Sequence, residues 1–102
     1  MEKFIGKKVI IRADRAGVFY GELADIEPLG DKLMVEMKNC RRIWYWDGAA
    51  SLSQLATNGT TAPADCKFTV TVPSMTIMGV IEIIPCSDKA IKSIEKVDVW
   101  KR

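Results

Sequence analysis

Hydrophobic and polar residues alternate along the first half of the chain with the period of a β-strand. In residues 7–13, Val9 and Ile11 fall on one side and Ile10 and Arg12 on the other. The other strands that this pattern predicts in the first half cover residues 18–27, 32–37 and 40–46. Only short turns separate them, and short turns join antiparallel neighbours, so we expect a meander of hairpins.

The second half mixes strands with two short helices. Ser51 and Gln54 have the spacing of a helix N-terminal cap, and Gly59 is suited to end that helix. Ser87 predicts the start of a second helix. Two further strands are expected over residues 68–72 and 75–85. Together the patterns predict an α+β fold, mainly antiparallel β, with about six strands and two short helices in one β-rich domain, residues 1–102.

The composition is that of an ordinary globular protein. Hydrophobic residues make up 48% and charged residues 27% of the 102 residues, and no apolar run approaches the roughly 20 residues that cross a bilayer. The first residues do not have the pattern of a signal peptide. Cys40, Cys66 and Cys86 are widely spaced, as expected of free thiols in a reducing compartment, so we expect a cytoplasmic protein without a membrane partner.

Histidine is absent, which removes the commonest general base and transition-metal ligand. No glycine-rich phosphate loop is present, and the carboxylates are scattered, with no pair at a spacing that suggests catalysis. We therefore expect no enzymatic activity, no metal and no other cofactor. The net charge of +2 is too small to indicate nucleic-acid binding by itself.

Charge is scarce in the second half. Between Asp47 and Glu82 only Asp65 and Lys67 are charged, and Phe68 to Ile81 carry no charge at all. Such a segment is either a central strand buried on both faces or a contact surface for another subunit. Because so short a chain has few elements with which to cover a long strand twice, we expect a homo-oligomer, a dimer or higher.

The segment 40–46 concentrates aromatic residues and arginines. In an extended strand Arg42, Trp44 and Trp46 project to one side, whereas Arg41 and Tyr45 take the other. A guanidinium and two indoles on one surface favour a planar, anionic ligand, because bases stack on indoles and arginine binds phosphate. The alternative is that the tryptophans are core residues and the arginine stacks beside them.

Neighbouring residues extend this predicted site. Arg12 adds positive charge, Phe19 or Tyr20 completes the wall, and the amides after Asp47 precede a helix start, where an anion can bind. A slip of one residue would exchange the two faces of the strand, so Arg41 stays a candidate beside Arg42. The candidate ligand-binding residues are Arg12, Phe19, Tyr20, Arg41, Arg42, Trp44, Trp46, Asp47, Gly48 and Ala49.

Residues 41–56, Arg-Arg-Ile-Trp-Tyr-Trp-Asp-Gly-Ala-Ala-Ser-Leu-Ser-Gln-Leu-Ala, resemble a widespread family of small proteins encoded by phages and prophages. Further matching segments are residues 16–23, 66–68, 80–85 and 99–100. Small phage proteins of this character are also similar to the nucleotide sponges that blunt the Thoeris and CBASS defences. Those sponges are non-catalytic oligomers in the cytoplasm of the host bacterium.

The resemblance implies that the chain binds and sequesters a nucleotide-derived immune signal, a cyclic ADP-ribose isomer or a cyclic dinucleotide. Its partners would then be a small nucleotide and other copies of itself. Two alternatives stay open. The strand could be a stacking platform for single-stranded nucleic acid, or the apolar segment could bind and inhibit a host protein.

Overall fold

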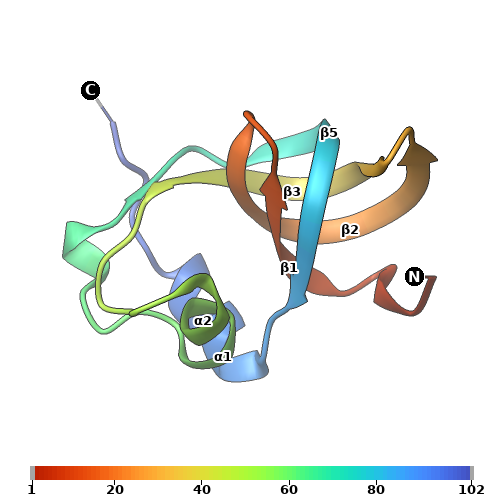
Figure 1. Cartoon of the computed structure of the whole chain (residues 1–102). Coiled ribbons are helices and arrows are strands. Elements are labelled where there is room, and N and C mark those ends of the chain that lie inside the picture. The colour runs from red at the N-terminus through yellow and green to blue at the C-terminus, as the bar shows by residue number, and fades with distance from the viewer. Residues whose placement is uncertain (1, 102) are drawn as a thin grey trace.

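In the computed structural model, which describes residues 2–101, the strands form one antiparallel sheet that closes on itself (Figure 1). The strands are β1 (Lys8–Ala13), β2 (Gly17–Leu29), β3 (Lys32–Tyr45), β4 (Lys67–Phe68) and β5 (Val72–Pro85). The hydrogen-bonded order is β2-β1-β5-β3-β4, and β2 also pairs with β3. Strands β1, β2, β3 and β5 therefore make a closed ring, and β4 extends it at the end of β3. The expected α+β fold with mainly antiparallel strands is confirmed.

The ring encloses the first of two hydrophobic cores. The alternation in β1 places Val9 and Ile11 inside, where they meet Phe19, Met37 and Ile77 from the other strands of the ring. Ile10 points the other way and is equally buried, but in the second core. The alternation in the sequence thus identifies the two faces of β1 correctly.

The second core lies between the outside of the ring and two helices, α1 (Leu52–Asn58) and α2 (Asp88–Glu95), which pack side by side (Figure 1). Both helices begin at the predicted caps, because the Ser51 and Ser87 side chains accept hydrogen bonds from the amides of Gln54 and Ala90. Two 3-10 turns complete the secondary structure, η1 (Glu2–Phe4) and η2 (Pro63–Asp65). No helix within residues 2–101 is long and apolar enough to cross a membrane.

The strands expected at 32–37 and 40–46 are one continuous strand, β3, with a bulge at Asn39. Asn39 has a left-handed backbone, φ 50°, and the register against β2 shifts by one residue there. Gly21 faces this bulge. A Cβ atom at Gly21 would lie 3.0 Å from the Cα of Cys40 and 3.1 Å from the carbonyl oxygen of Lys38, so only glycine fits without displacement.

The expected strand at 68–72 is wrong. Only Lys67 and Phe68 pair with β3, and the next long strand begins at Val72 and runs through Pro73. Beyond Phe68 the pairing stops, and the Thr69 carbonyl accepts a hydrogen bond from the Arg41 side chain instead of from a neighbouring strand. Pro73 is tolerated because β5 pairs on one side only at that point, with β3.

The uncharged segment from Phe68 to Ile81 is not a strand buried on both faces. Ile77 and Val80 point into the ring, whereas Met78 is 61% exposed and Ile81 is also exposed. The sequence therefore places apolar side chains on the outer face of β5, and the interpretation as a strand buried on both faces is wrong.

Candidate functional site

Three aromatic or basic side chains from distant parts of the chain meet near the C-terminal end of β3. They are Trp44 of β3, Lys67 of β4 and Trp100, which follows α2. Arg42 precedes Trp44 by two residues in the same strand and is exposed as well. We call these four residues, Arg42, Trp44, Lys67 and Trp100, the aromatic–basic surface.

The two indoles of this surface are stacked. The ring centroids of Trp44 and Trp100 are 5.2 Å apart and the planes are inclined by 20°. Trp44 is nevertheless 59% exposed and Trp100 is 37% exposed. The ammonium of Lys67 lies 5.1 Å from the Trp44 centroid and 5.5 Å from the Trp100 centroid, close enough to be attracted by both rings. The result is an exposed aromatic pair with a cation beside it.

The segment that carries Trp100 is held against β4. The Trp100 amide donates a hydrogen bond of 2.9 Å to the Phe68 carbonyl, and Val99 forms a parallel bridge with Phe68. Lys67 directly precedes Phe68, so this pairing brings Lys67 and Trp100 together. Trp44 joins them because β4 pairs with the end of β3.

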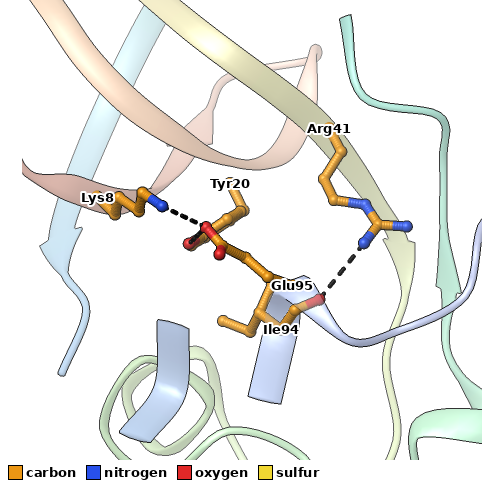
Figure 2. Close-up of polar contacts among 5 residues, drawn as sticks. All are labelled: Lys8, Tyr20, Arg41, Ile94 and Glu95. Carbon is orange, nitrogen blue, oxygen red and sulfur yellow. Dashed lines mark hydrogen bonds and ion pairs between the residues drawn. The ribbon is translucent and has the colours of Figure 1, made fainter. Parts of the chain in front are cut away.

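Arg41 was predicted to bind ligand, and the structure buries it. The side chain is 5% exposed, and its guanidinium donates to the carbonyls of Phe68, Thr69, Ile94 and Val97 at 2.9–3.4 Å. Figure 2 shows it pointing at the C-terminal end of α2, where carbonyls carry negative partial charge. Arg41 therefore fastens β3 to β4 and to the segment after α2, and its contact with a ligand stays a prediction.

Tyr20 is likewise part of the second core. Its hydroxyl donates a hydrogen bond of 2.7 Å to the Glu95 carboxylate, which also accepts one of 2.6 Å from Lys8 (Figure 2). Burial and the hydrogen bond to Glu95 raise the pKa of Tyr20. Burial raises the pKa of Glu95, but the hydrogen bonds from Lys8 and Tyr20 and the charge of Lys8 outweigh it, so the pKa of Glu95 is lowered. These groups connect β1 and β2 to α2.

Phe19 and Arg12 do not complete the predicted site either. Phe19 is buried inside the ring, and the Arg42 guanidinium lies over its ring, 4.8 Å from the centroid. Arg12 forms an ion pair of 2.9 Å with Glu82 and lines a shallow hollow near Arg15, apart from the aromatic–basic surface. Arg12 therefore contacts Glu82 and Phe19 contacts Arg42, and the part of both residues in a ligand site stays a prediction.

Trp46 leaves the face that it was expected to share with Trp44, because β3 ends at Tyr45. Its indole packs on the second core and donates a hydrogen bond of 3.3 Å to the Ala49 carbonyl. The Gly48 amide donates to the Asp47 carboxylate at 2.7 Å, and the Ala50 amide donates to the Gln54 side chain at 2.8 Å.

The turn after β3 thus uses these amides internally. The anion site predicted around Asp47, Gly48 and Ala49 is not formed. Gly48 is instead required for a close approach to residues 60–62, since it has a left-handed backbone, φ 80°, and no room for a Cβ atom.

A hollow of about 430 Å³ lies beside Trp100, between η2 and the segment that follows α2. Its lining residues are Pro63, Ala64, Cys66, Lys96, Asp98, Val99, Trp100 and Lys101. Sequence reasoning missed both the hollow and the role of Trp100. The one feature of the sequence that could have pointed to this region is Lys67, the one basic residue between Asp47 and Glu82.

This arrangement is chemically suited to binding. Exposed indoles stack with flat rings, and the cations of Lys67 and Arg42 attract an anion attached to such a ring. Cys40 and Cys86 are poorly suited to act as nucleophiles, because burial raises the pKa of each thiol to about 12.

No curated protein and no solved structure matches the chain. One family model, described as a domain of unknown function (DUF6948), matches residues 6–94, which include the whole closed sheet, α1 and all of α2 except its last residue. The chain therefore belongs to the DUF6948 family.

Proposed function

We propose that this protein is a non-catalytic binder of a nucleotide-derived ligand and that the ligand stacks on the aromatic–basic surface. The observation that carries the proposal is the exposed Trp44–Trp100 pair with Lys67 within 5.5 Å of both rings. A nucleotide is the common metabolite class that joins a flat ring to an anion. One stacked base contributes about 1–3 kcal/mol in known single-strand sites.

The finer proposal is sequestration of a cyclic nucleotide signal, with suppression of a bacterial anti-phage defence. It is supported by the resemblance of residues 41–56 to phage-encoded proteins. Tight capture of a small ligand generally requires that 70–90% of its surface be buried. Trp44 is open to solvent, so this proposal requires a second copy of the chain, or movement of neighbouring residues, to enclose the ligand.

The solvent exposure of the Trp44 side chain favours a second candidate ligand, single-stranded nucleic acid. A strand that runs across an exposed aromatic pair does not need to be enclosed, since several bases and phosphates share the binding. The two candidates differ in measurable ways. Affinity for a strand rises with its length and falls steeply with salt, whereas affinity for an enclosed small nucleotide does neither.

Calorimetry with cyclic dinucleotides, a cyclic ADP-ribose isomer and oligonucleotides of increasing length tests the proposal. We expect Trp44→Ala to weaken binding by about 5- to 150-fold, which corresponds to one lost stacking contact. Arg42→Ala should weaken it as well. Absence of binding across the whole panel would refute the proposed function.

Two variants serve as matched controls. Trp46→Phe removes the other indole near the end of β3, which packs on the second core, and should leave binding unchanged. Arg15→Ala removes an exposed arginine from the hairpin between β1 and β2 and should do the same. If the control variants lost as much binding affinity as Trp44→Ala and Arg42→Ala, the effects would not be specific to the aromatic–basic surface.

Self-association is proposed on separate grounds. Met78 and Ile81 expose apolar side chains on a strand segment that carries no charge, and depletion of charge is typical of interface cores. Sedimentation of the native chain should give a mass above that of one chain, and Met78→Lys should reduce it. A monomeric native chain at high concentration would refute this part.

A further inference from the structure

The hollow beside Trp100 has the size and the lining of a site for one nucleotide. Its volume of about 430 Å³ lies within the range of about 300–1,000 Å³ that is usual for small-ligand pockets. Trp100 forms part of its wall. The Trp100 ring is stacked on Trp44 and has the Lys67 ammonium 5.5 Å from its centroid, and it is 37% exposed, so part of the indole is open to a ligand in the hollow.

Charged groups in the lining can bind the other parts of a nucleotide. Lys96 and Lys101 both line the hollow and provide ammonium groups for a phosphate. The one acidic residue in this lining is Asp98. A carboxylate near two lysines weakens phosphate binding, but its oxygens can accept hydrogen bonds from a donor on another part of the ligand.

The chemistry of the bases identifies that donor. A carboxylate has two oxygen acceptors side by side and binds best to two neighbouring N–H groups. Guanine presents such a pair on its pairing edge, from the ring N1–H and the exocyclic amino group. Adenine presents one amino group beside an acceptor, which a carboxylate would repel.

We infer that this hollow prefers guanine nucleotides: the base lies against Trp100, the Asp98 carboxylate accepts from the guanine edge, and Lys96 and Lys101 bind the phosphate. The inference rests on the proposed function, because it assumes a nucleotide ligand. It assigns base selectivity to Asp98, a residue outside the aromatic–basic surface.

Titration of the native chain with GMP, IMP and AMP, followed by tryptophan fluorescence and calorimetry, tests this. We expect GMP to bind about tenfold or more tightly than AMP, since hydrogen bonds to a charged group are the strong ones. The affinity for IMP, which lacks the amino group, should lie between the affinities for GMP and AMP. Asp98→Asn should weaken GMP binding toward the level of AMP while AMP binds equally or more tightly.

Asp65→Asn is the matched control, because Asp65 is an exposed aspartate at the end of η2 that does not line the hollow. The Asp65→Asn variant should prefer GMP over AMP as strongly as the native chain does. Equal affinity for GMP and AMP in the native chain would overturn the guanine preference and leave the proposed function intact. Tighter binding of both nucleotides in Asp98→Asn would show that Asp98 only repels phosphate. If no nucleotide binds the native chain, the proposed function fails as well.

Discussion

The guanidinium of Arg41 donates a hydrogen bond of 2.9 Å to the carbonyl of Val97, three residues before Trp100. Through this bond the strand that carries Trp44 holds the segment that carries its stacking partner. The same side chain also binds the carbonyls of Phe68 and Thr69 beside Lys67. The relative positions of the residues in the aromatic–basic surface therefore depend on a neighbour that faces the opposite side of β3.

Replacement of Arg41 should be strongly destabilising. Arg41→Met removes four hydrogen bonds to backbone carbonyls, and those of Thr69 and Val97 lose the donor that Arg41 supplies, so we expect the free energy of unfolding to fall by about 3 kcal/mol or more. Urea denaturation followed by circular dichroism measures this. Arg42→Met is the matched control and should cost less than about 1 kcal/mol, because that side chain is exposed over Phe19. Equal losses in the two variants would contradict the role given to Arg41.

The stacked indoles should have an optical signature. Two indoles at 5.2 Å couple their electronic transitions, so the native chain should show a paired positive and negative band in far-ultraviolet circular dichroism. Trp44→Phe and Trp100→Phe should each abolish that feature, whereas Trp46→Phe should keep it. A spectrum that changes with Trp46 but not with Trp100 would mean that the stack does not form in solution.

Acid should weaken the contacts around Glu95. The pKa of Glu95 is lowered in the folded chain, so as the pH falls the unfolded chain takes up the proton first and is favoured. The stabilisation is complete above pH 4.5, the ordinary value for this group, and is lost as the pH drops through the lower folded pKa.

Glu95→Gln should therefore reduce the difference in unfolding free energy between neutral and acidic pH. The effect should be at most about 1 kcal/mol, because the ion pair with Lys8 is partly exposed. Urea midpoints measured across this pH range give the comparison, with Glu22→Gln as the control outside the cluster. An unchanged pH profile in Glu95→Gln would show that the cluster contributes nothing to acid sensitivity.

The thiols should react slowly in the folded chain. Cys40 and Cys66 are buried, and the pKa values of Cys40 and Cys86 are raised to about 12 by burial, so little thiolate is present at neutral pH. Reaction with Ellman's reagent should be slow in the native chain and should reach three thiols per chain in denaturant. Rapid reaction of all three under native conditions would contradict this packing.

Local patterns in the sequence predict the framework of this fold well. The alternation of Val9, Ile10 and Ile11 identifies the two faces of β1, and the serine caps locate both helices, because these features depend only on residues close in the chain. The order of the ring is not local. It depends on pairing between β1 and β5, which no single segment encodes.

The candidate site was predicted less well, for identifiable reasons. Trp46 lies apart from Trp44 because β3 ends between them, and alternation cannot show where a strand ends. Arg41 and Arg42 look equivalent in the sequence, and only the packing around the bulge at Asn39 decides which of them is buried. Trp100 joins the site through the pairing of β4 with a distant segment, which has no periodic signal.

Closure of the sheet also has a consequence for synthesis of the chain. The ring is completed when Val9 and Ile11 of β1 pair with Pro85 and Ile83 of β5, so the first strand made needs the last one. A nascent chain on the ribosome can build the β1–β2 hairpin early, but it cannot finish the ring until β5 has left the exit tunnel. Folding of the ring is then expected to be completed in one step once β5 is free to pair, and truncated chains that lack β5 should be substrates for proteases.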